Sequence, residues 1–453
     1  MQYKMILCGF FTIFVPLDYP PLKTCMLSTE KRNLIRLLMQ QEIVPAIGCT
    51  EPISVALCTA KASQALKKRP EKIEAFLSAN VVKNAMGVGI PGTGMIGLPI
   101  AIALGALRGN PDNGLELLKD ITPEDVKNGK CYIDERRVQV HLHSEIIDNL
   151  YIEIRCSAGE DSSRAVIRGN HTCFSTVERN GETLFNETIT GTGAADNEGS
   201  LPLTFQTICE YAIESPVEEL SFILEAAMMN KKVSEEALSR NYGHNVARSV
   251  SNRKGRHIFG DNLHSRMVIS TAGACDVRMD GSMMPVMSNS GSGNQGIAAS
   301  MPILTYAENE HASEENLIRA LTLSGLLVIY MKQHLGKLSA LCGCVVASTG
   351  SSCGITYLMG GSNEQIMFAA KNMIANITGM ICDGAKPGCA LKIASSVSTA
   401  TLSAVMAMEN EVVSSLEGII DEDIDQTIRN MALIGNSGMR ETDRMVLDIM
   451  TRK

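Results

Sequence analysis

The sequence contains no tryptophan, and aromatic residues of any kind make up only 4% of its 453 residues. It also lacks a dense block of Lys or Arg, and its formal net charge is -8. Because a protein that binds nucleic acid needs a concentrated basic face, this composition argues against a nucleic-acid partner. Hydrophobic residues form 45% of the chain, enough to fill a large core, so the sequence predicts a globular protein.

Apolar runs long enough to cross a membrane are also missing. The stretches MILCGFFTIFVPL near the N-terminus and MIGLPIAIALGAL at residues 95–107 are shorter than the roughly 20 residues that a spanning helix needs. The first also lacks the cleavage pattern of a signal peptide. Ser28 or Thr29 can cap a helix that starts soon after Met26. We therefore expect no membrane partner, and we interpret residues 1–25 as a disordered or over-early-start extension.

The character of the sequence changes near residue 127. Residues 26–126 show mainly helical periodicity, whereas residues 127–190 alternate apolar and polar positions and offer a tight turn at Asn180 and Gly181. Helical periodicity returns in residues 191–453. The sequence thus predicts an α+β protein, with a small β-rich domain in the N-terminal half and a mainly helical catalytic domain.

Two glycine-rich stretches fit the pattern G-x-G-x-x-G: GTGMIG at residues 92–97 and GSGNQG at residues 291–296. No repeating βαβ pattern surrounds them, so a nicotinamide site is improbable. A tight turn before a helix is the simplest interpretation. The alternative is a carboxylate site, because the first N–H groups of a helix have no partner within it.

Cysteine is abundant in number but not in density. The 14 cysteines are spread over a long chain, which is typical of a reducing cytoplasm, and we expect most of them to fill the core. Cys49 differs, because Thr50 can start a helix and would leave the thiol just outside its N-terminus. The helix dipole there is expected to lower the thiol pKa. Cys49 is a candidate base or nucleophile, with a small turn residue as the alternative.

Two further segments carry cysteines among glycines. In ICDGAKPGCALK, residues 381–392, the KPG sequence should break a helix and hold Cys382 and Cys389 on a loop. The segment LCGCVVASTGSSCGITYLMGG, residues 341–361, adds Cys342, Cys344 and Cys353. Thiolates bind zinc or iron–sulfur clusters, but the CxxC knuckles typical of zinc sites are absent. Spacing alone leaves a metal site and a core role equally open.

The motifs GCTEP (48–52), SNSGSGNQG (288–296), LCGCVVASTGSSCGITYLMGG and NMIANITGMICDGAKPGCALK (372–392) resemble the L-cysteine desulfidase family, including its bacterial members. That family is distantly similar to the alpha chain of iron–sulfur L-serine dehydratases. The resemblance runs from about Met26 to the end of the chain. It implies a lyase that releases sulfide from L-cysteine and gives pyruvate and ammonia, without pyridoxal phosphate.

The resemblance also implies a 4Fe-4S cluster with three cysteine ligands and one open iron. By motif, Cys382 and Cys389 take two ligand positions, and either Cys342 or Cys344 takes the third. Cys49 takes the role of proton acceptor. An iron without a fourth protein ligand can act as a Lewis acid toward the substrate.

Other residues could bind the small amino-acid substrate. Ser290, Ser292 and Asn294, with the backbone N–H groups around them, could receive its carboxylate, and Arg278 could pair with it or form a structural ion pair. The alternatives to a cysteine lyase are a dehydratase for L-serine or another β-substituted amino acid, and a cluster-bearing redox or cysteine sensor without turnover. We expect a cytoplasmic protein and consider a homodimer as its assembly.

Overall fold

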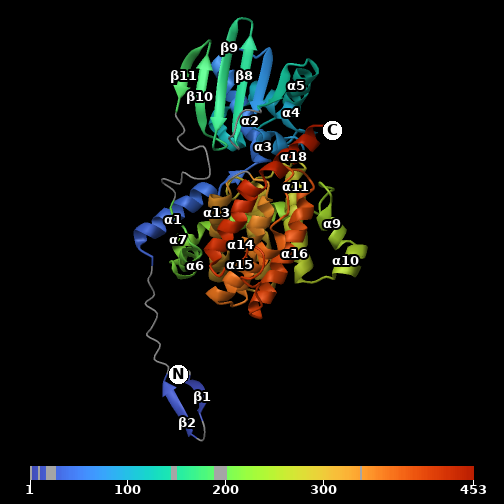
Figure 1. Cartoon of the computed structure of the whole chain (residues 1–453). Helices are drawn as coiled ribbons and strands as arrows, with labels where there is room; N and C mark the ends of the chain where they lie inside the picture. Colours follow the sequence, from blue (N-terminus) through green and yellow to red (C-terminus); the bar gives the residue numbers. More distant parts are fainter. Residues whose placement is uncertain are drawn as a thin grey trace.

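The computed structural model describes residues 3–8, 11–16, 27–143, 150–187, 201–336 and 339–452. A β-sheet lies at one end of the molecule and a larger helical body at the other, with helices from the N-terminal third between them (Figure 1). The two parts are not consecutive in the chain, because the C-terminal helix returns to the junction between them (Figure 1).

The N-terminal third supplies the junction and part of the sheet. A helix begins after Ser28, whose side chain accepts a hydrogen bond from the Lys31 amide, as the sequence predicted. The elements of this third are α1 (Thr29–Glu42), β3 (Pro45–Ala46), α2 (Thr50–Leu66), β4 (Lys72–Leu77), α3 (Ala79–Ala85), β5 (Gly89–Ile90), β6 (Met95–Ile96), α4 (Leu98–Arg108), the 3₁₀ helix η1 (Pro111–Glu116) and α5 (Pro123–Asp134).

The sheet has six strands in the order β11-β10-β9-β8-β4-β7. Besides β4 these are β7 (Val138–Leu142), β8 (Tyr151–Ala158), β9 (Asp161–Arg168), β10 (Phe174–Arg179) and β11 (Glu182–Asn186). All neighbouring pairs are antiparallel except β4 and β7. Helix α2 packs on the face formed by β8, β9 and β10. Asn180 and Gly181 both have positive φ and form the predicted tight turn between β10 and β11.

The helical body is built around α13, α14 and α16, which are buried along much of their length. Its elements are α6 (Phe205–Glu214), α7 (Val217–Leu220), α8 (Phe222–Glu236), α9 (Val246–Ser251), α10 (Arg253–Phe259), α11 (Leu263–Met279), β12 (Val286–Met287), α12 (Gly293–Asn309), α13 (Glu314–Leu335), α14 (Gly343–Leu358), α15 (Asn363–Ile377), α16 (Cys389–Met408), α17 (Ile424–Leu433), the π-helical turn η2 (Ile434–Gly438) and α18 (Arg440–Thr451).

The α+β class with a mainly helical part is confirmed. The β-rich range differs from the prediction, because residues 127–134 form the end of α5 and strand β4 lies inside the sheet. A capping box between Thr122 and Asp125, with Pro123 in the first turn, starts α5. The division into domains stays a prediction. In the predicted extension the structure describes only the antiparallel pair β1 (Tyr3–Cys8) and β2 (Phe11–Pro16), and the rest of residues 1–25 lies outside the described residues.

Helix α16 is long and apolar enough to cross a membrane by length and composition. In the structure it packs against α11, α14 and α15, and one whole side of it is buried. This packing is what a core helix of a globular protein requires.

Candidate active site

Cys49 is the N-cap residue of α2, and its side chain faces a carboxylate. The thiol lies 3.0 Å from Oε2 of Glu51 in the first turn of the same helix, and both residues are buried. The Thr50 hydroxyl lies 3.0 Å from the same oxygen and 2.9 Å from the carbonyl oxygen of Gly291. Thr50 therefore links the start of α2 to the second glycine-rich stretch.

The expectation of a lowered pKa at Cys49 is wrong for the structure at rest. Burial raises the pKa of the thiol well above its usual value, and the charge of Glu51 raises it further. Arg278 acts in the opposite direction but is outweighed. The helix N-terminus is present as predicted, but burial and the neighbouring carboxylate decide the direction of the shift.

The second glycine-rich stretch forms the loop between β12 and α12. Helix α12 begins at Gly293, so the N–H groups of residues 293–295 have no partner inside the helix. The amides of Ser290 and Ser292 are engaged by the carbonyl oxygens of Glu42 and Asn289. The Ser290 hydroxyl donates to Asn289 Oδ1. The donors that the loop offers to a carboxylate thus come from the start of α12.

Arg278 lies beneath this loop. Its Nη1 donates to Asn294 Oδ1 at 3.0 Å and its Nη2 to the carbonyl oxygen of Gly48 at 2.8 Å. Its Nε is packed so closely against Gly293 that a Cβ on that glycine would lie 2.3 Å away. These contacts hold the residue before Cys49 against the loop, which supports a positioning role. Pairing with a substrate carboxylate stays a prediction.

The two other cysteine segments are joined by their backbones. Leu341 and Ile381 form an isolated antiparallel bridge, the Cys342 amide donates to the carbonyl oxygen of Met380, and the Cys382 amide donates to that of Ala340. Cys342 is the N-cap of α14 and Cys344 lies in its first turn. Cys389 is the first residue of α16, not a loop residue as predicted, because the turn at Pro387 and Gly388 starts a helix.

The four thiols are close enough to influence one another's ionisation. The Cys344 thiol donates to Cys342 and lowers the pKa of Cys342, and Lys392 adds to this effect. Burial raises the pKa values of Cys382 and Cys389, and the charge of Cys342 raises both further. Cys342 is therefore the thiol that interacts with all the others and the one most readily ionised.

Cations surround the same thiols. Lys392 Nζ donates to the carbonyl oxygen of Ile381 at 2.7 Å and forms an ion pair with Asp383. Lys386 pairs with the same carboxylate. Burial would raise the pKa of Asp383, but hydrogen bonds from the two lysines lower it to about 2. Lys83 of α3, buried and paired with Asp443 of α18, also lowers the pKa of Cys382. These charges favour thiolates at this place.

The four thiols are donors of the kind that an iron–sulfur cluster uses. Among the described residues no three His, Cys, Asp or Glu side chains are close enough to hold one metal ion. In an iron–sulfur cluster each thiolate binds a different iron, so its protein ligands are spaced more widely than those of one ion. These cysteines are buried or partly buried, influence one another's ionisation and lie near lysines that favour thiolates, so the residues are compatible with a cluster.

Sequence reasoning did not assign roles to four residues that the fold brings to this site. Glu51 faces Cys49, and Lys83 faces the Cys382 segment. His171, in the turn between β9 and β10, is buried. Its ring packs against Gly291, because a Cβ added to that glycine would lie 3.3 Å from the ring. Gln295 contacts Gly343 between Cys342 and Cys344. Glu51 and Gln295 lie within the motifs GCTEP and SNSGSGNQG, so their position there was the one available signal. Lys83 and His171 reach the site through contacts between distant segments, which the sequence does not reveal.

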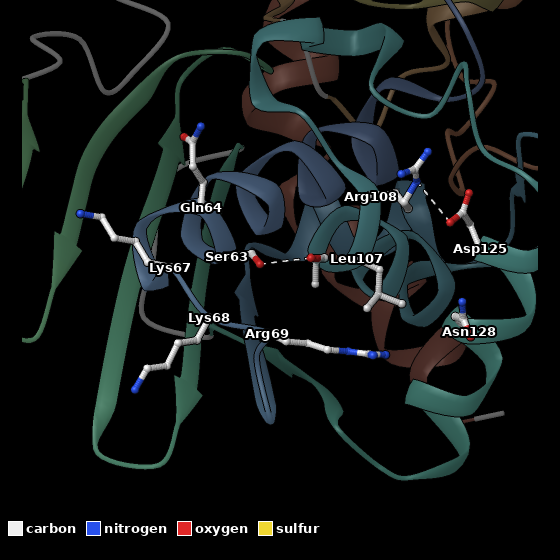
Figure 2. Close-up of a pocket in the computed structure, with 10 residues that line it drawn as sticks. Ser63, Gln64, Lys67, Lys68, Arg69, Leu107, Arg108, Asp125 and Asn128 are labelled. Atoms are coloured by element: carbon white, nitrogen blue, oxygen red, sulfur yellow. Dashed lines mark hydrogen bonds and ion pairs between the residues drawn. The ribbon is translucent and has the colours of Figure 1, made fainter.

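A separate cavity lies away from these thiols. It measures about 520 Å³ and is lined by residues at the C-terminal end of α2 and on α4 and α5, at the opposite end of α2 from Cys49. Arg108 in this cavity pairs with Asp125, and Ser63 donates to the carbonyl oxygen of Ala106 (Figure 2). The open shape and the exposed lysines are typical of a surface hollow, and no cysteine lines it.

The family model described as the serine dehydratase alpha chain matches residues 112–448, which is most of the chain. The chain therefore belongs to the serine dehydratase alpha chain family, a family of lyase type. The matched range includes the glycine loop of α12 and all four thiols at the starts of α14 and α16.

Several curated relatives that match most of the chain are named UPF0597 proteins. A UPF0597 protein of Bacteroides fragilis is 58% identical over 428 residues, covering 94% of this chain and 100% of the relative. A UPF0597 protein of Parabacteroides distasonis is 58% identical, and the match covers 92% of this chain and 97% of the relative. A UPF0597 protein of Photobacterium profundum is 43% identical, and the match again covers 92% of this chain and 97% of the relative. The resemblance stated from the motifs is thereby confirmed at the level of the family.

Proposed function

We propose that the chain is an iron–sulfur-dependent lyase that eliminates sulfide from L-cysteine and gives pyruvate and ammonia. The observation that carries this proposal is the meeting of three groups: the thiols of α14 and α16, the glycine loop of α12 and Cys49 at the start of α2. The contact of Gln295 with Gly343 and that of Thr50 with Gly291 connect them.

We propose Cys342, Cys382 and Cys389 as the residues that hold a 4Fe-4S cluster. Cys342 is preferred over Cys344 because its amide donates to the Met380 carbonyl oxygen beside the bridge that joins the two cysteine segments, and its charge acts on both Cys382 and Cys389. A cluster held there would supply Lewis acidity toward the leaving sulfur.

The protein groups then have separate tasks. The N–H groups at the start of α12 bind the substrate carboxylate. Cys49 Sγ, as a thiolate, accepts the α-proton, and Glu51 Oε2, 3.0 Å away, accepts the hydrogen bond of the thiol that results. Loss of the α-proton and the β-sulfur gives aminoacrylate, which tautomerises and hydrolyses to pyruvate and ammonia.

L-serine is the second candidate substrate, because the family model is described as a serine dehydratase alpha chain. A cluster-bearing sensor without turnover is the alternative from another class. The test is anaerobic reconstitution with iron and sulfide, followed by assays of sulfide and pyruvate from L-cysteine and of pyruvate from L-serine. Equal amounts of sulfide and pyruvate support the proposal. Turnover of L-serine alone would make the protein a dehydratase, and a loaded but inactive protein would favour the sensor.

A further inference from the structure

Gln295 occupies the point where the glycine loop meets the thiols. It lies in the first turn of α12, and only 4% of its surface is exposed. Its Nε2 lies 2.9 Å from the place that a Cβ on Gly343 would take. Gly343 stands between Cys342 and Cys344, so the amide lies directly beside the segment proposed to hold the cluster.

The amide oxygen of Gln295 has no hydrogen-bond partner among the described residues. Other buried amides in the same region are satisfied. The Asn230 side chain donates to the Met287 carbonyl oxygen and to Ser300 and accepts from the Met287 amide. Asn289 donates to the Gly325 carbonyl oxygen and accepts from Ser290. Because a buried acceptor without a donor costs stability, an exception beside a candidate active site points to a ligand that brings the donor.

An α-amino acid carries such a donor in its ammonium group. The N–H groups at the start of α12 suit its carboxylate, which leaves the ammonium in need of an acceptor. Glu51 Oε2 is already within hydrogen-bond distance of Cys49 and Thr50. Among the buried acceptors without a partner in the part of the chain that the structure describes, the Gln295 oxygen is the one on the first turn of α12, next to the N–H groups proposed for the carboxylate.

We propose that Gln295 accepts a hydrogen bond from the α-ammonium group of the substrate and so selects primary α-amino acids over α-hydroxy acids of the same shape. This inference rests on the proposed function, since it assigns a substrate contact at that site. It concerns binding and does not depend on which β-substituent leaves.

The test compares Gln295→Met, which keeps the length of the side chain and removes the acceptor, with Gln206→Met on the exposed surface of α6 as the matched control. The reconstituted proteins are assayed for KM and kcat with L-cysteine. Their thermal midpoints are measured with L-alanine, which has no leaving group, and with L-lactate, which has no ammonium. We expect Gln295→Met to raise KM by about ten- to a hundredfold, the effect of a hydrogen bond to a charged group, with a smaller change in kcat.

L-alanine should raise the midpoint of the wild type and of Gln206→Met but not that of Gln295→Met, and L-lactate should have little effect on any of them. A Gln295→Met protein with normal KM and normal stabilisation by L-alanine would overturn the proposal. Should this variant not fold, the wild type still decides, because equal stabilisation by L-alanine and L-lactate also overturns it. If L-alanine binding depends on Gln295 but no substrate turns over, the proposed reaction fails and the amino-acid site stands.

Discussion

The cysteines packed against the sheet and those at the starts of α14 and α16 are equally buried but chemically different. Cys58 of α2 donates to the carbonyl oxygen of Ala165 in β9, and burial raises its pKa well above the usual value. Burial likewise raises the pKa of Cys156 in β8 to about 12. Cys342 is also buried, yet its pKa is lowered. Burial therefore does not decide whether a thiol is inert.

The neighbours make the difference. Cys342 has a thiol that donates to it, the first amides of a helix and the charge of Lys392. Cys49 shows that a helix start is not enough, because Glu51 and burial together raise its pKa at the same kind of position. Cys342, the proposed ligand, and Cys49, the proposed base, thus both lie at a helix start, but the neighbouring groups shift their pKa values in opposite directions.

The largest effect is expected from removing the most readily ionised thiol. Cys342→Ser should lose the cluster and reduce turnover by more than about a hundredfold. Loss of a residue that only supports a metal ligand can already cost roughly that much. Iron content and turnover of the reconstituted protein measure it. The matched control is Cys353→Ser, because Cys353 is buried and bonded to the carbonyl oxygen of Ile366. If Cys342→Ser keeps its iron and Cys344→Ser loses it, Cys344 rather than Cys342 is the third ligand.

Removal of the base thiol should have the next largest effect. Cys49→Ser should lower kcat by about 10²- to 10⁴-fold, the contribution typical of a general base, while the iron content is unchanged. Cys58→Ser, on the same helix but facing the sheet, should retain turnover, since a hydroxyl can keep its hydrogen bond to Ala165. Stopped-flow measurement of pyruvate formation separates the two variants. Normal turnover in Cys49→Ser would remove this residue from the mechanism.

A smaller effect is expected from the cation beside the thiols. Lys392→Met removes the charge that favours thiolate at Cys342 and the bond to the Ile381 carbonyl oxygen. We expect about ten- to a hundredfold weaker cluster retention, measured as the rate of iron loss to a chelator. Lys231→Met, which breaks a surface ion pair with Glu308, is the control and should behave as wild type. Identical rates in both variants would contradict a role for Lys392.

The smallest effect on activity is expected in the sheet, where charge serves stability. Burial would raise the pKa of Glu153 in β8, but hydrogen bonds from Arg164 and Tyr151 lower it to about 2. A lowered carboxylate pKa contributes stability above the unfolded-state pKa, and this contribution is lost as pH falls from about 4.5 to about 2. Its size is about 3 kcal/mol.

Urea unfolding of the apoprotein between pH 7 and pH 2 tests this charge. Glu153→Gln should be less stable than wild type at pH 7, and the difference should shrink toward pH 2, with turnover at pH 7 unaffected. Glu178→Gln, whose partner Arg164 is shared but whose side chain is more exposed, should change stability by less than about 0.5 kcal/mol. A pH-independent difference for Glu153→Gln would show that packing rather than charge is lost.

The fold class, the turn at Asn180 and Gly181 and the helix start at Ser28 could be predicted because each depends on local pattern. The place of strand β4 in the sheet could not be predicted. Its six residues lie between two helices, and the sequence does not show that they pair with β7 and β8. The same limit applies to the site. Motifs indicated which cysteines matter, but the pKa of Cys49 depends on the burial that only the fold determines, and the neighbourhood of His171 and Gly291 joins segments 120 residues apart.

The ion pair between Lys83 and Asp443 joins residues 360 positions apart. Through this pair the C-terminal helix, α18, contacts Lys83, the lysine whose charge acts on Cys382. During synthesis on the ribosome, the sheet and α2 can fold long before this helix has emerged. The contacts around Cys382 are therefore complete only once α18 has been synthesised, and a cofactor that depends on them would enter after that point.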